Sequence, residues 1–269
     1  GSVLRPASFT GILGFKPTFG TISRSGMSPI SQRLDHPGIY ANCVEDIDLV
    51  ASVILSYDSN DLDMIQNYQY KRTVSLNKPI KFGFVRGPVW NFGDEDMKHG
   101  IEEFVKNAQL DIEELDLGKD FDDAAKAHEI IMNGSIANSL MNYYQTDKSN
   151  LHPFTVKRIE AGIPVSASDY VSAIEQAKKM EQILKQFFKR YDAIITPAAP
   201  GQAPRDLMNT GNAIFNGYWT MMGVPAISLP FLKGKDDLPI GIQFIANWSE
   251  DLKLLEICKY ILEKEKLAN

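Results

Sequence analysis

Gly1 and Ser2 are the two adjacent residues of this sequence whose types best suit nucleophilic chemistry. The glycine lets a backbone come close to a ligand, and the serine offers a hydroxyl beside its own backbone N–H. This pairing suits acyl transfer, in which an alkoxide attacks a carbonyl carbon and backbone N–H groups hold the oxyanion that forms. Gly-Ser is also what a cleaved expression tag leaves behind, so the two residues alone leave both interpretations open.

Glycine and proline recur at short intervals through residues 1–20. The residues concerned are Pro6, Gly11, Gly14, Pro17 and Gly20. Because proline lacks a backbone donor and glycine tolerates conformations that other residues avoid, the spacing predicts tight turns, with neither a helix nor a long strand. Ordering such a loop costs conformational entropy, which favours a functional role for it.

The whole stretch GSVLRPASFTGILGFKPTFG resembles the end of the amidase signature, and the segment that follows it, in the amidase signature family. The resemblance implies that Ser2 is the nucleophile and that the backbone N–H groups of Gly1 and Ser2 help to hold the oxyanion. The family usually carries arginine two residues after the serine, where this chain has Leu4 followed by Arg5. That order resembles a subgroup reading Gly-Ser-Val-x-Arg-Pro. No metal or organic cofactor is implied.

The family's catalytic triad contains two further residues, a serine in a cis peptide and a lysine, both from a segment that precedes the nucleophile. No residue in 1–269 matches either position. We therefore expect residues 1–269 to form a single amidase-like α/β domain that is incomplete at its N-terminus. We also expect this polypeptide alone to be inactive, because losing a member of a catalytic unit costs several orders of magnitude in rate. An inactive relative that serves as a binding or interaction module is the alternative.

The composition is that of an ordinary globular protein, with 44% hydrophobic and 23% charged residues. The net charge of −6, without a long basic block, argues against a nucleic-acid partner. No apolar run reaches the roughly 20 residues that a membrane helix needs, so we expect no membrane partner. Disordered and fibrous classes are excluded.

Cys43 and Cys258 are the two cysteines, and they lie in unrelated contexts. Two buried thiols in a reducing compartment are the expected state, which favours a cytoplasmic location. The four histidines show no spacing typical of metal ligands, so a metal site is not expected. They are His36, His99, His128 and His152.

Hydrophobic periodicity predicts alternating strands and helices. Strands are predicted at 81–85, 112–115, 190–197 and 238–245, and helices at 44–54, 94–108, 121–144, 166–188 and 249–262. Residues 57–78 are polar and aperiodic, which predicts a surface excursion. The resemblance implies a three-layer α/β/α fold around a mixed, twisted sheet, and it implies that the loop with Asp35 and His36 is chiefly architectural.

The segment before Gly223 resembles a family helix near the active site, and we expect Asn212, Asn216 and Trp219 there to line the substrate pocket. Glutamyl-tRNA amidotransferase subunits of the A type, an alternative within the family, generally carry an acidic residue in this helix. Residues 211–220 contain no acid. The sequence therefore favours an amidase that hydrolyses a small-molecule amide through a serine acyl-enzyme. A homodimer, or association with a missing N-terminal fragment, is left open.

Overall fold

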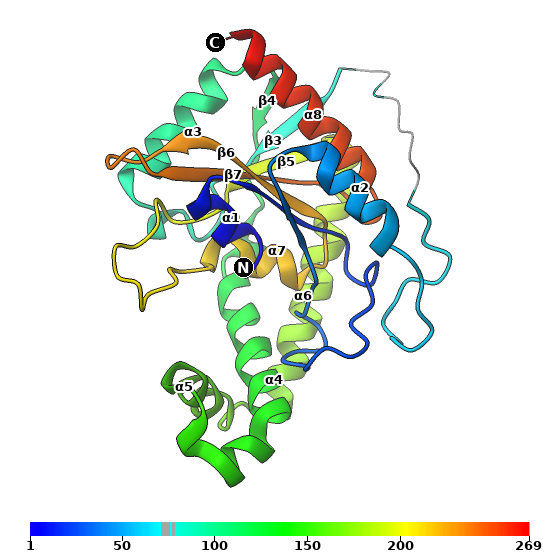
Figure 1. Ribbon diagram of the computed structural model, residues 1–269, viewed down its shortest axis with the longest axis vertical. Coiled ribbons are helices and arrows are strands. Elements are labelled where there is room, and N and C mark those ends of the chain that lie inside the picture. The colour runs from blue at the N-terminus through cyan, green and yellow to red at the C-terminus, as the bar shows by residue number, and fades with distance from the viewer. Residues whose placement is uncertain (71–75, 77–78, 269) are drawn as a thin grey trace.

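The computed structural model describes residues 1–70, 76 and 79–268, and within these residues a single mixed sheet of seven strands organises the chain (Figure 1). The strands are β1 (Leu13–Lys16), β2 (Ile39–Ala41), β3 (Lys81–Phe84), β4 (Asp111–Glu114), β5 (Ala193–Pro197), β6 (Ala226–Lys233) and β7 (Pro239–Ile245). Their spatial order is β2-β1-β6-β7-β5-β3-β4. The β3 strand is parallel to β4 and β5, and the other neighbours are antiparallel. The mixed sheet confirms the expected fold class.

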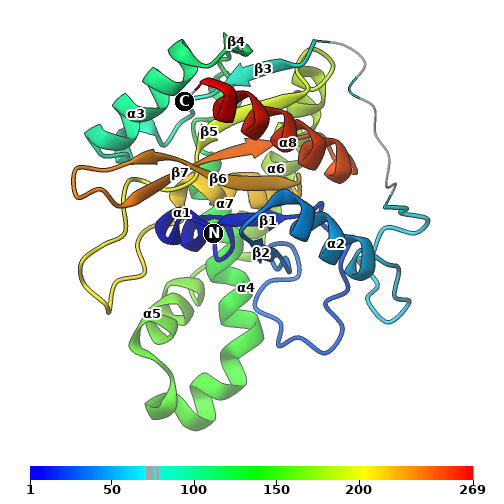
Figure 2. The same cartoon turned by 45° about the horizontal axis from the view of Figure 1, so that its top comes forward.

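Helices cover both faces of this sheet and complete the three layers (Figure 2). They are α1 (Leu4–Thr10), α2 (Val44–Ile54), α3 (Glu95–Asn107), α4 (Ala124–Asp147), α5 (Pro153–Gly162), α6 (Ala167–Phe187), α7 (Ile214–Met221) and α8 (Asp251–Ala268). Helices α3 and α8 lie over one face, and α1 and α7 lie over the other. Helix α4 packs against α5, α6 and α7, and its far end and α5 extend away from the sheet.

The prediction that residues 1–20 form only tight turns is wrong. Helix α1 and strand β1 both lie in this stretch. Pro6 is tolerated because it occupies the first turn of α1, where its missing N–H breaks no helical bond. Gly11 then ends the helix in the left-handed conformation, at φ 71°. The same glycine and proline residues that suggested a loop therefore act as helix boundaries.

The predicted helices and strands outside this region are confirmed with shifts at their ends. Ser166 caps α6 as expected, because its hydroxyl accepts a hydrogen bond from the Asp169 N–H. Helix α5 was not predicted, although Pro153 at its first position is a typical signal of a helix start. Its cap residue, His152, is not a typical one, but the side chain accepts a hydrogen bond from the Phe154 N–H. Cys258 is buried, but Cys43 is only partly buried, so the expectation of two buried thiols is wrong for Cys43.

The surface excursion predicted over residues 57–78 is irregular in its described part, and residues 71–75 and 77–78 lie outside the described residues. It is not purely superficial. Asp61 and Met64 are buried, and the N–H of Ile65 donates to the carbonyl of Gly20 over 2.8 Å. No helix of the described chain combines the length and the apolar character required to cross a bilayer.

Candidate active site around Ser2

Ser2 lies in the turn that leads into α1, and its side chain is exposed. Val3 forms the N-cap of the helix with a backbone in the right-handed helical region. Val3, Leu4 and Ala7 are buried, so the apolar face of α1 fixes the turn to the body of the domain. The structure thus presents the Ser2 hydroxyl to solvent on a segment that is itself held in place.

The segment before α7 packs directly against this turn. A Cβ atom on Gly1 would stand only 2.6 Å from the Cβ of Ala213, so the backbone at position 1 needs glycine. Arg5 reaches the same segment, because its guanidinium donates to the carbonyl of Gly211 over 3.3 Å. Two segments about 210 residues apart in the sequence therefore form one wall beside Ser2.

The loop before β2 closes a second side of the turn. The hydroxyl of Tyr40 donates to the carbonyl oxygen of Ser2 over 2.6 Å. Gly38 lies against Val3, since a Cβ on Gly38 would stand 2.6 Å from a methyl group of Val3. Sequence reasoning missed Tyr40, because its proximity to Ser2 depends on the pairing of β1 with β2.

Asp35 and His36, whose loop is expected to be architectural, form hydrogen bonds within that loop. A carboxylate oxygen of Asp35 accepts hydrogen bonds from the backbone N–H groups of Ile30 and Ser31, over 2.8 and 3.0 Å. The Nδ1 atom of His36 lies 3.0 Å from the carbonyl oxygen of Leu34. Burial lowers the pKa of His36 well below its usual value, so its ring is neutral at pH 7. These contacts fit the architectural role expected for this loop.

Lys16 is a buried lysine at the end of β1, and sequence reasoning also missed it. Its ammonium group donates to the carbonyl oxygens of Val224, over 2.5 Å, and of Pro17, over 3.0 Å. Burial lowers the pKa of Lys16 to about 7, and the nearby carboxylate of Asp251 partly opposes the effect. The side chain therefore ties β1 to the turn before β6.

The three residues expected to line a substrate pocket occupy different environments. Asn212 is exposed, and its side-chain oxygen accepts a hydrogen bond from the Ile214 N–H at the start of α7, over 3.0 Å. Asn216 is fully buried and donates to the carbonyl oxygen of Ala198 over 2.9 Å. Trp219 is also fully buried. Asn212 lies close to Gly1, because its sequence neighbour Ala213 contacts Gly1. Asn216 and Trp219 lie within the core.

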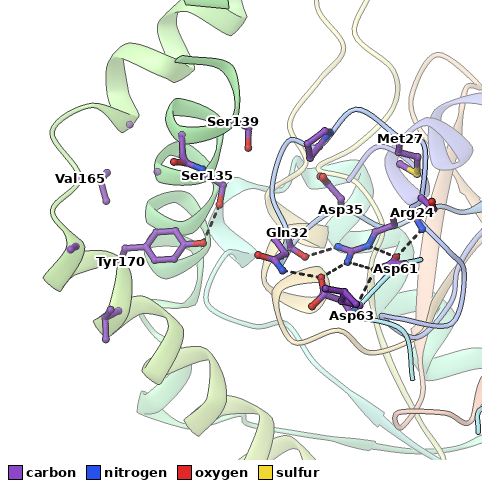
Figure 3. A pocket seen from close by; sticks show the side chains of 18 of the residues that line it. Arg24, Met27, Gln32, Asp35, Asp61, Asp63, Ser135, Ser139, Val165 and Tyr170 are labelled. Atoms are coloured by element: carbon purple, nitrogen blue, oxygen red, sulfur yellow. Dashed lines mark hydrogen bonds and ion pairs between the residues drawn. The ribbon is translucent and has the colours of Figure 1, made fainter. Parts of the chain in front are cut away.

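A cavity of about 890 Å³ lies between the loop of residues 24–35 and helices α4 and α6 (Figure 3). Figure 3 shows Arg24 held by Asp61, over 3.1 Å, and by Asp63, over 2.5 Å. On the opposite wall, the hydroxyls of Ser135 and Tyr170 lie 3.1 Å apart. The cavity lining combines one guanidinium, of Arg24, with the carboxylates of Asp35, Asp61 and Asp63, so the carboxylates outnumber the cation.

The surroundings of Ser2 combine an exposed serine hydroxyl with a close-packed backbone, and the described part of the chain holds no cluster of potential metal ligands. The family model described as Amidase matches residues 1–255. The A-type component of the glutamyl-tRNA(Gln) amidotransferase of Agathobacter rectalis is 29% identical to this chain, over 99% of this chain and 60% of that protein. The chain thus spans about 60% of the length of this relative.

Solved structures share the same architecture. One comes from a study of a vestigial protein complex and the evolutionary origins of an s-triazine catabolic enzyme. It has a TM-score of 0.84 at 21% identity, and the match covers 98% of this chain and 61% of the other. The 6-aminohexanoate cyclic dimer hydrolase, solved with its substrate, has a TM-score of 0.78 at 20% identity, covering 95% of this chain and 60% of the other. At these identities the likeness concerns the fold.

Proposed function

Because the chain belongs to the amidase family, we propose that it supplies Ser2 as the nucleophile of an enzyme that hydrolyses the carbon–nitrogen bond of a small-molecule amide. The observation that carries this proposal is the position of Ser2. Its side chain is exposed, in a turn held by Gly1 against Ala213 and by Tyr40 on the other side. Backbone fixed beside a serine hydroxyl is what acyl transfer requires.

In the proposed reaction, the Ser2 oxygen forms a bond to the amide carbonyl carbon while its proton passes to a base. The carbon–nitrogen bond then breaks, the amine leaves with a proton, and water hydrolyses the resulting ester to release the acid and restore Ser2. Backbone N–H groups of Gly1 and Ser2 are proposed to hold the oxyanion. The family resemblance implies that a lysine and a second serine, on a segment preceding Ser2, move the proton.

A second candidate is supported by the relative from Agathobacter rectalis, whose name is that of one component of an amidotransferase. In that case the chain would release ammonia from glutamine and work with partner subunits. The residues from Asn212 to Thr220 contain no carboxylate that could bind an α-amino group, which favours the simple amidase. We therefore keep glutamine hydrolysis as the alternative.

The test measures product release by the full-length protein from two kinds of substrate, simple aryl amides and glutamine. Release of an aryl amine, lost in Ser2→Ala, supports the amidase. Release of ammonia from glutamine, also lost in Ser2→Ala, supports the alternative. Turnover that survives Ser2→Ala contradicts both, because each assigns the nucleophile to Ser2.

The remaining parts of the proposal concern location and partners. The two cysteines are free thiols, which suits a cytoplasmic enzyme. Strand β2 lies at the edge of the sheet, and an edge strand can pair with another segment. We propose this edge for a homodimer or for a complementary N-terminal segment. The size of the protein in solution, alone and with that segment, distinguishes the two.

A further inference from the structure

The carbonyl group of Ser2 lies just before the hydrogen-bond series of α1, which begins at the carbonyl of the N-cap residue Val3. In an α-helix, each carbonyl accepts a hydrogen bond from the N–H four residues later. The residue four positions after Ser2 is Pro6, which has no N–H. The next bond in the series is present, from the Ala7 N–H to the Val3 carbonyl over 3.3 Å. The Ser2 carbonyl must therefore find its donor elsewhere.

Tyr40 supplies this donor. Its hydroxyl donates to the Ser2 carbonyl over 2.6 Å and so links segments 38 residues apart. Burial of part of the side chain raises the pKa of Tyr40, so the hydroxyl keeps its proton at neutral pH. The bond thus gives the Ser2 carbonyl a donor that α1 does not supply.

Two glycines allow Tyr40 to reach the Ser2 turn. The strand register places Gly14 of β1 opposite Tyr40 of β2. A Cβ on Gly14 would stand 2.5 Å from the Cβ of Ala7 in α1 and 3.0 Å from the Val3 carbonyl oxygen. A Cβ on Gly38 would stand 2.6 Å from Val3. Side chains at these positions would push β1 and the residue before β2 away from α1 and Val3, so the close packing of the paired strands β1 and β2 against the turn sets the position of the Tyr40 hydroxyl.

We propose that Tyr40 is a positioning residue for Ser2, and this inference rests on the proposed role of Ser2 as the nucleophile. A fixed Ser2 carbonyl fixes the peptide unit that joins Ser2 to Val3. That peptide sets the backbone torsion of Ser2 and hence the direction of its hydroxyl. Without the Tyr40 bond, the turn samples other orientations, and the reactive one is populated less.

The experiment measures the rate constant for inactivation of the full-length protein at a series of fluorophosphonate concentrations. The series gives two values: the maximal inactivation rate constant, and the fluorophosphonate concentration at which half of it is reached. Tyr40→Phe removes only the hydroxyl. Loss of one neutral hydrogen bond is expected to lower the maximal rate about three- to tenfold, with the half-saturating concentration within about twofold. Tyr143→Phe, at a 56% exposed tyrosine on α4, is the matched control and should leave both values unchanged.

A Tyr40→Phe protein that reacts as fast as wild type, or that changes only in the half-saturating concentration, overturns the inference. A wild-type protein in which Ser2 does not react overturns the proposed function instead. Hydrogen exchange in peptides covering residues 1–12 then decides the role of Tyr40. Faster exchange in Tyr40→Phe than in Tyr143→Phe supports it, and equal exchange contradicts it.

Discussion

Gly1 and Ala213 lie so close together that a Cβ atom on Gly1 would stand 2.6 Å from the Cβ of Ala213. We predict that Gly1→Ala displaces the Ser2 turn and slows fluorophosphonate labelling of Ser2 by on the order of tenfold or more, because small misplacements of reacting groups have large effects on rate. Ala213→Gly removes the opposing Cβ and should restore most of the labelling rate in the Gly1→Ala protein.

The control for this pair is Ala213→Gly alone, which should label at nearly the wild-type rate. A double variant as slow as Gly1→Ala itself would contradict the account, because the loss would then not come from contact with Ala213. The labelling rate of all four proteins forms one double-mutant cycle.

Asp251 is predicted to be the strongest polar contributor to the stability of the segment after β1. Its buried carboxylate accepts hydrogen bonds from the N–H and hydroxyl of Thr18, both over 2.7 Å, and from the hydroxyl of Tyr68 over 2.9 Å. Asp251→Ala leaves these donors unsatisfied and should lower the free energy of unfolding in urea by about 3 kcal/mol. The exposed Asp122→Ala should change it by less than about 0.5 kcal/mol. Equal effects of the two substitutions would refute this role.

Lys16 is predicted to make stability rise with pH on the alkaline side of neutrality. Burial lowers its pKa in the folded protein to about 7, from an ordinary value of 10.5. Between these values the unfolded chain binds a proton that the folded chain does not, so the free energy of unfolding increases with pH at about 1.4 kcal/mol per pH unit. The gain in the free energy of unfolding is complete above pH 10.5, the ordinary pKa of lysine, and it is lost as the pH falls towards 7.

The measurement for Lys16 is urea unfolding at several values from pH 7 to pH 10. Because tyrosines and cysteines also titrate in this range, the informative quantity is the difference between wild type and Lys16→Met. The free energy of unfolding of wild type minus that of Lys16→Met should increase as pH rises. The corresponding difference for the exposed Lys126→Met should stay constant. A constant difference for Lys16→Met would show that Lys16 stays charged throughout.

Elements with strong periodicity could be predicted from the sequence. Val44, Ile47 and Ala51 of α2 are buried as their helical spacing indicates. Val50 lies in the same helix but is 42% exposed, because spacing alone does not fix the width of the buried face. In β7, the middle strand of the sheet, Ile240, Ile242 and Phe244 are buried, and so are the intervening Gly241 and Gln243.

The surroundings of Ser2 could be predicted only in part. The Gly-Ser pair and its resemblance to a family motif identified the candidate nucleophile, whose role stays a prediction. Tyr40 and Ala213 were not identified as neighbours, because their positions depend on strand register and on packing between segments far apart in the sequence. Asp251 lies in the helix predicted over residues 249–262, and nothing local indicated that its carboxylate binds Thr18.

The central claim is that Ser2 is the reactive nucleophile, and the most direct measurement is fluorophosphonate labelling of the full-length protein followed by peptide mapping. The account predicts a single modified peptide with the label on Ser2, and no labelling of Ser2→Ala. Label on another residue, or labelling that persists in Ser2→Ala, would contradict the claim.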